Sequence, residues 1–137
     1  MNYNEDYYRS GNYTDYLQRA GRYQKLAEDT RGLLKNIGLD RGPVLDFGCA
    51  VGFLIEALNH MNYDTYGVEI SEWALNECRR KNLNVSTEVD YSIQYGVTYA
   101  LDVFEHMTPD ELDQFLIKIN TKCLIFRMPI CAEGEDD

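Results

Sequence analysis

The stretch that most constrains this chain is residues 44–52, where a short apolar run turns through small residues into a helical pattern. Residues 44–47 are apolar apart from one acid, and small residues then follow at every second position: Gly48, Ala50 and Gly52. A strand that turns sharply into a helix through small residues exposes backbone N–H groups, and a ligand can approach its main chain without meeting a Cβ. The stretch therefore predicts a ligand-binding loop at the carboxyl end of a buried strand.

The residues of this turn separate two kinds of nucleotide site. A dinucleotide site needs G-x-G-x-x-G, whereas Asp46-Phe47-Gly48-Cys49-Ala50-Val51-Gly52 reads as G-x-A-x-G behind an acid. This resembles motif I of the class I S-adenosylmethionine (SAM) methyltransferases, (D/E)-x-G-x-G-x-G, with alanine as the middle residue. We expect that alanine to fit if its backbone keeps a negative φ. The resemblance implies that five residues line the cofactor: Asp46, Gly48, Cys49, Ala50 and Gly52.

A second landmark is Glu69, at the end of an apolar run that predicts a strand over residues 65–70. In βαβ nucleotide folds an acid about 20 residues past the glycine turn binds the ribose diol, and a carboxylate can accept from both hydroxyls. The resemblance to methyltransferases then implies that Ile70 lies against the adenine and Asp90 near its amino group, although Glu88 competes for the latter role. The alternative is that Glu69 is a solvated acid at a strand end.

The third landmark is residues 100–107, Ala-Leu-Asp-Val-Phe-Glu-His-Met. It resembles the motif IV region of small-molecule class I methyltransferases, which implies that Leu101 contacts the cofactor and makes His106 the candidate base. The alternative is that the Glu-His pair only holds the turn. The pattern is not N-P-P-Y or D-P-P-Y, which disfavours amino-methylation of adenine or glutamine.

Residues 102–106 also allow a second interpretation, as part of a metal site. Asp102, Glu105 and His106 form D-x-x-E-H, similar to the metal ligands of small-RNA terminal 2′-O-methyltransferases. Those sites need a further downstream histidine, which this chain lacks. We therefore expect no metal site.

The remaining apolar patterns alternate between strand and helix. Strands are predicted over 44–47, 65–70, 83–89, 96–101 and 123–128, and helices over 53–61, 71–82 and 109–121. About six residues separate Asp90 from the next strand, which leaves no room for a helix there. Such alternation predicts an α/β fold: an open, doubly wound, mostly parallel sheet, five strands in order 3-2-1-4-5, with helices on both faces and an N-terminal helical segment.

The N-terminal region is rich in tyrosine, with six of the chain's 11 in its first 23 residues. We expect residues 1–13 to be an irregular arm and residues 14–38 to form a helix with a break near Gly32. These rings either cover the cofactor or pack on the helical layer of the sheet. The chain is predicted to be a single SAM-binding domain, residues 1–137, with an arm and helix (1–40), a Rossmann-like core (44–130) and an acidic tail (131–137).

Composition excludes several classes of function. A net charge of −10 with 13 basic residues argues against a nonspecific grip on nucleic acid. No apolar run reaches the roughly 18–20 residues that span a bilayer, and the N-terminus does not resemble a signal peptide, so we expect a cytoplasmic protein away from membranes. The four cysteines lack C-x-x-C spacing, which favours free thiols over zinc or disulfides.

These observations predict a SAM-dependent methyltransferase domain that acts on a small-molecule acceptor and releases S-adenosylhomocysteine (SAH). Two alternatives are a non-catalytic module that binds SAM or SAH, and a nicotinamide-linked Rossmann protein. The full class I fold has a further helix and two-stranded hairpin after strand five, so residues 123–128 would form an open sheet edge. We expect a homo-oligomer through this edge, unless the N-terminal helix covers it.

Overall fold

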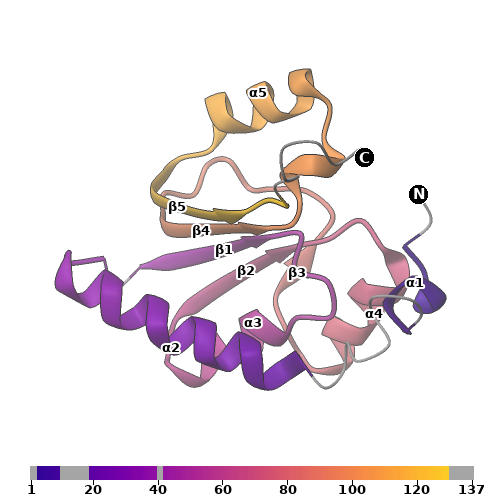
Figure 1. Ribbon diagram of the computed structural model, residues 1–137, viewed down its shortest axis with the longest axis horizontal. Helices are drawn as coiled ribbons and strands as arrows, with labels where there is room; N and C mark the ends of the chain where they lie inside the picture. Colours follow the sequence, from indigo (N-terminus) through magenta and orange to yellow (C-terminus); the bar gives the residue numbers. More distant parts are fainter. Residues whose placement is uncertain (1–2, 10–18, 40–41, 130–137) are drawn as a thin grey trace, which may run out of the picture.

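A computed structural model describes residues 3–9, 19–39 and 42–129. Its centre is one five-stranded sheet in the order β3-β2-β1-β4-β5, in which every pairing is parallel (Figure 1). The strands are β1 (Pro43–Phe47), β2 (Asp64–Val68), β3 (Val85–Ser86), β4 (Tyr95–Leu101) and β5 (Thr121–Arg127). The predicted fold class and strand order are confirmed.

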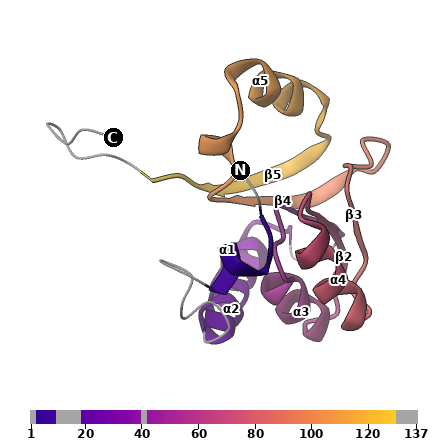
Figure 2. The same ribbon diagram turned by 90° about the vertical axis from the view of Figure 1, so that its right-hand side faces the viewer.

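Helices cover both faces of the sheet (Figures 1 and 2). One face carries α2 (Ala20–Asn36), α3 (Phe53–His60) and α4 (Glu72–Arg80), and the other carries α5 (Pro109–Lys118). A five-residue helix, α1 (Glu5–Arg9), lies beside α4, and a 3-10 helix, η3 (Phe104–His106), follows β4. Among the residues described, no helix is long and apolar enough to cross a membrane.

The sequence explains why α3 and α5 form where they do. In α3, Leu54, Ala57 and Leu58 bury one apolar face against β1 and β4. Thr108 and Glu111 form a reciprocal capping box at the start of α5, which satisfies two otherwise unpaired backbone N–H groups. Phe115 is the buried residue of α5, whereas Leu116 is 45% exposed.

The N-terminal region differs from the prediction in two ways. Residues 5–9 form α1 rather than an irregular arm, and α2 continues through Gly32 without a break. Burying Ala27 and Leu34 outweighs the roughly 1 kcal/mol cost of a mid-helix glycine. Gly38 closes the helix with a φ of +75°, as its C-capping role requires. Residues 14–18, where this helix was predicted to start, lie outside the described residues.

The region between β2 and β4 is less regular than predicted. The third strand spans only Val85–Ser86 instead of residues 83–89, because the Ser86 hydroxyl donates to the Glu88 carbonyl at 2.6 Å and turns the chain away from β2. The described residues 87–94 contain no helix, as expected. Half-buried side chains from this link pack over the same sheet face with Tyr66 and the buried Tyr95. They replace the cover that a crossover helix would supply.

The cysteines of the described part of the chain are free thiols: Cys49, Cys78 and Cys123. Cys49 and Cys78 are buried and pack together with Ile55, whereas Cys123 is half-buried. Cys131 lies outside the described residues.

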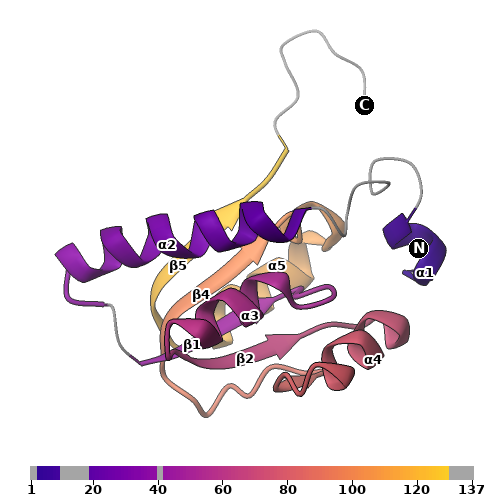
Figure 3. The same ribbon diagram turned by 90° about the horizontal axis from the view of Figure 1, so that it is seen from below.

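Strand β5 lies at one edge of the sheet, as predicted. Helix α2 runs beneath β4 and β5 (Figure 3) and covers the face that carries Cys123 and Ile125. It therefore covers one face of β5, and no strand of the described residues pairs with the outer edge of β5. Near that edge the apolar side chain of Phe126 is 56% exposed.

Self-association through β5 remains a prediction. We expect sedimentation velocity to show dimers or larger species that grow with concentration, and Phe126→Glu to shift them towards monomer because an edge charge opposes strand pairing. Leu33→Glu, which alters an equally exposed residue on α2, is the control and should change nothing. A wild-type monomer at high concentration would contradict the edge interaction.

Candidate cofactor site at the carboxyl edge of the sheet

A cavity of about 320 Å³ lies at the carboxyl ends of the strands. Its walls come from the ends of β1, β2, β4 and β5, with side chains of α1, α2 and the η3 region closing its mouth. The strand order reverses between β1 and β4, and ligands of open α/β sheets bind at such a switch point. The volume falls within the roughly 300–1,000 Å³ of small-molecule sites.

The structure brings eight of the ten predicted site residues to this cavity. They are Asp46, Gly48, Cys49, Ala50, Glu69, Ile70, Leu101 and His106. Gly52 instead begins α3, where an added Cβ would lie 2.4 Å from the Leu83 side chain, so its glycine is needed for packing. Asp90 lines a separate cavity of about 40 Å³ and accepts from Ser92.

The loop after β1 has an unusual backbone. Gly48 has a φ of +85°, and a Cβ at this position would lie 2.4 Å from Val103 Cγ2. Ala50 has a φ of +51°, so the expectation of a negative φ is wrong. A left-handed conformation costs a non-glycine residue about 1–2 kcal/mol, and other contacts must offset this cost.

Glu69 supplies those contacts. Its Oε1 accepts from the Ala50 N–H at 2.9 Å, and its Oε2 accepts from the N–H groups of Ile70 at 2.8 Å and Ser71 at 2.9 Å. Only 8% of the residue is exposed. Glu69 therefore ties the loop after β1 to the end of β2, a role that the sequence did not reveal. A carboxylate has about four acceptor sites, so capacity remains for a ligand hydroxyl.

Asp46 is a buried acid in the wall of this cavity. It is 5% exposed and faces the cavity, and no hydrogen bond joins it to the residues described. Burial, with a smaller contribution from the Glu69 carboxylate, raises the pKa of Asp46 to about 7. A buried carboxylate without a partner is costly, and a cationic group of a ligand would supply that partner.

The sequence matches one family over most of its length. A family model described as methionine biosynthesis protein MetW matches residues 28–125. The chain belongs to the MetW family. Among curated protein sequences, none matches it significantly.

Solved structures place the MetW-family chain within one fold. DesVI of Streptomyces venezuelae superposes with a TM-score of 0.68 at 20% identity, over 89% of this chain and 57% of that one. The plantazolicin methyltransferase BpumL in complex with SAH superposes with a TM-score of 0.61 at 18% identity, over 77% of this chain and 46% of that one. Magnesium protoporphyrin IX methyltransferase (ChlM) of Synechocystis with bound SAM superposes with a TM-score of 0.55 at 24% identity, over 78% of this chain and 57% of that one. The chain has the class I SAM-dependent methyltransferase fold, and it spans about half the length of these proteins.

The cavity of this MetW-family chain also contains residues that sequence reasoning missed. Arg127, at the end of β5, holds the Asp102 carboxylate through Nε at 3.0 Å and Nη2 at 2.6 Å. Asp102 is therefore paired with Arg127. The described residues contain no cluster of three metal-binding side chains, and the expectation of no metal site stays a prediction. The sequence did contain a signal for this contact, because Arg127 is a single arginine in the otherwise apolar segment 123–128. Its partner Asp102 could not be named from the sequence, because the contact depends on the pairing of β4 with β5.

The N-terminal tyrosines fit both alternatives in part. Tyr8 is buried and stacks on Trp73 of α4 with ring centroids 5.5 Å apart, which is packing on the helical layer. Tyr3 and Tyr7 line the cavity, and the Tyr3 ring lies edge-on to His106 at 6.4 Å. Helix α1 therefore joins the layer around α4 to the mouth of the cavity.

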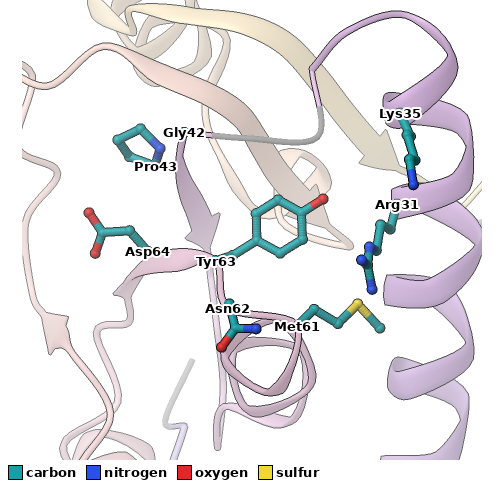
Figure 4. A pocket seen from close by; sticks show the side chains of 8 residues that line it. All are labelled: Arg31, Lys35, Gly42, Pro43, Met61, Asn62, Tyr63 and Asp64. Carbon is teal, nitrogen blue, oxygen red and sulfur yellow. The ribbon is translucent and has the colours of Figure 1, made fainter.

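A larger cleft, of about 590 Å³, opens at the amino ends of β1 and β2 (Figure 4). Arg31 and Lys35 of α2 border it on one side, and the Asp64 carboxylate points away from them. The carboxyl-terminal ends of α2 and α3 lie here, and Lys35 in the last turn complements the helix dipole. None of the ten predicted site residues lines this cleft, whereas eight of them line the smaller cavity.

The strain at Ala50 leads to a stability prediction. Ala50→Gly should raise the free energy of unfolding by about 1 kcal/mol, because glycine adopts a φ of +51° without steric cost. Ala27→Gly, the same change within α2, should lower it by about 1 kcal/mol or more. Urea unfolding measures both. A loss of stability in Ala50→Gly similar to that in Ala27→Gly would contradict the assigned backbone.

The raised pKa of Asp46 leads to a pH prediction. Between about pH 4 and 7 the folded protein holds a proton that the unfolded chain releases, so this group destabilises the fold increasingly as pH rises through that window and no further above it. Its contribution is at most about 4 kcal/mol.

Urea unfolding should therefore show that Asp46→Asn raises the free energy of unfolding of the ligand-free protein. The increase should grow from pH 4.5 to 7 and stay constant from pH 7 to 8.5. Asp113→Asn, at an exposed acid of α5, is the control. A gain in the free energy of unfolding of Asp46→Asn that does not change with pH would contradict the raised pKa of Asp46.

Proposed function

We propose that this MetW-family chain is a SAM-dependent methyltransferase domain that transfers a methyl group to a small-molecule acceptor. The observation that carries the proposal is the buried Asp46, which has no hydrogen bond within the described part of the chain and faces the cavity beside the left-handed loop at the switch point of the sheet. SAM and SAH both carry an ammonium group at their amino-acid end, and this group would be a cationic partner for Asp46. The fold and the family description, which concerns methionine biosynthesis, are compatible with a protein that binds a methionine derivative.

The residues of the cavity fit the cofactor along its length. Ile70 is 71% exposed and offers an apolar surface for the adenine. Glu69 retains acceptor capacity for a ribose hydroxyl, and Gly48, Cys49 and Ala50 of the loop after β1 line the cavity. When bound, SAM supplies an electrophilic methyl group for displacement by an acceptor lone pair held about 3 Å away.

His106 is the proposed base for an acceptor that must lose a proton. It lines the cavity with its side chain 40% exposed, and its Nε2 lies 3.6 Å from the Glu105 carboxylate. That carboxylate would stabilise an imidazolium once a proton has been taken up. His60, at the exposed end of α3, lies away from the cavity.

Ligand binding tests the proposal first. SAH at 100 times its Kd should stabilise the fold by about 2.7 kcal/mol, and NAD should not. Asp46→Asn should weaken SAH at least tenfold in calorimetry, because a charge-assisted hydrogen bond contributes about 1.5–3 kcal/mol. Stabilisation by NAD but not by millimolar SAH would favour the nicotinamide-linked alternative.

Methyl transfer tests the second half of the proposal. With labelled SAM and a metabolite extract, label should enter the small-molecule fraction. His106→Gln should slow this transfer at least tenfold without changing SAH affinity, while His60→Gln should match the wild type. SAH binding without any transfer would identify a non-catalytic module instead.

A further inference from the structure

The end of α4 holds two consecutive carbonyl groups of the loop after β1. The Cys78 thiol donates to the Ala50 carbonyl at 3.2 Å, and the Lys81 ammonium donates to the Val51 carbonyl at 3.1 Å. Ala50 lines the cavity, and its own N–H donates to the Glu69 carboxylate. The loop is therefore bonded to two neighbouring segments, the end of β2 and the end of α4.

The backbone at the end of α4 is itself fixed. The Leu83 N–H donates to the Cys78 carbonyl at 3.0 Å, and the Asn82 N–H donates to the Arg79 carbonyl at 3.0 Å. Asn82 has a φ of +59°, so the helix closes in the Schellman arrangement, with a left-handed residue after its cap. Leu83 then packs against Gly52, where an added Cβ would lie 2.4 Å from the leucine side chain. The side chains that hold the loop therefore start from an ordered helix end.

Lys81 makes three contacts, and two of them reach the wall of the cofactor site. Its Nζ lies 2.7 Å from the Glu56 carboxylate of α3. It also donates to Val51 and lies 4.7 Å from the centroid of the Phe53 ring, a distance at which a cation is attracted to an aromatic face. Phe53 lines the cavity, whereas Lys81 does not. Lys81 therefore supports the loop and the ring from behind, in addition to joining α4 to α3.

We propose that Lys81 is a positioning residue for cofactor binding, which fixes the Val51 carbonyl and the Phe53 ring in the arrangement that the cofactor meets. The inference rests on the proposed function and adds to it a residue outside the cavity. The competing role is purely structural, an ion pair with Glu56 that only joins α4 to α3. The Lys81 and Glu56 side chains are 30% and 37% exposed, so water screens this ion pair and its contribution to stability is small.

Calorimetry with SAH separates the two roles through three variants. Lys81→Met, which keeps the apolar stem, should weaken SAH binding at least fivefold, because the loop and the Phe53 ring lose their common support and the ligand is held less well. Lys81→Arg, which keeps the charge and side-chain donors, should stay within twofold of the wild type. Glu56→Gln, which removes the ion pair but leaves the contacts of Lys81 with Val51 and Phe53, should also stay within twofold.

Urea unfolding of the same variants provides a second readout. Lys81→Met and Glu56→Gln should both lower the unfolding midpoint, because both remove the ion pair, whereas only Lys81→Met should lose affinity for SAH. Lys81→Gln, which is shorter but stays polar, should show the same loss of affinity, and it replaces Lys81→Met if that variant does not fold. Arg80→Met removes the adjacent arginine, whose side chain is 72% exposed and paired with Glu77. It is the control and should bind SAH as the wild type does.

The outcomes are distinguishable. Unchanged SAH affinity in a folded Lys81→Met or Lys81→Gln variant would overturn the inference and leave the proposed function intact. An equal loss of affinity in Lys81→Met and Glu56→Gln would assign the purely structural role and overturn it as well, as would a Lys81→Arg variant that binds no better than Lys81→Met. Failure of the wild type to bind SAH would overturn the proposed function and this inference together.

Discussion

The site depends on the carboxylate of Glu69. Its oxygens accept three backbone N–H groups, one from the loop after β1 and two from the chain beyond β2. These bonds hold Ala50 in a left-handed conformation that alanine does not favour, and they orient Ser71, whose side chain caps α4. The same carboxylate that is expected to bind a ribose thus also shapes the loop beneath it.

A second acid makes this arrangement costly. Asp46 is buried near Glu69, and burial together with that neighbouring charge raises its pKa to about 7. The two acids repel each other in the ligand-free protein, and neither desolvation nor repulsion helps the fold. A cationic group of a ligand would reverse the sign of this effect, because it would pair a buried charge that has no partner among the described residues. A group that destabilises the ligand-free fold in this way is typical of functional positions.

The sequence predicted the parts that depend on local patterns. The parallel α/β sheet followed from alternating elements, and the helix over 109–121 was predicted from its apolar pattern and is found as α5 (Pro109–Lys118). Helix α1 was missed because burial of Tyr8 against Trp73 stabilises a segment without periodicity. The short β3 was missed because the Ser86 hydroxyl turns the chain by a contact that composition does not reveal.

The candidate site was predictable in outline for the same reason. Eight of the ten predicted residues reach one cavity because parallel strands end at the same edge of a sheet. The pairing of Asp102 with Arg127 depends on β4 lying beside β5, 25 residues later in the chain. The positive φ of Ala50 depends on Glu69, 19 residues later. Contacts between residues distant in the sequence determine both the Asp102–Arg127 pair and the conformation of Ala50, so the motifs alone could not predict them.

An amide chemical-shift map of the protein titrated with SAH tests most directly whether the cofactor binds at the carboxyl edge of the sheet. We expect the perturbed amides to cluster at residues 46–50, 69–71 and 101–103, with those of Ile70 and Ser71 affected through Glu69. The amides of residues 61–64, beside the amino-edge cleft, should stay unchanged. Perturbations confined to residues 61–64, or none at saturating SAH, would contradict the assignment of the cofactor to the carboxyl edge of the sheet.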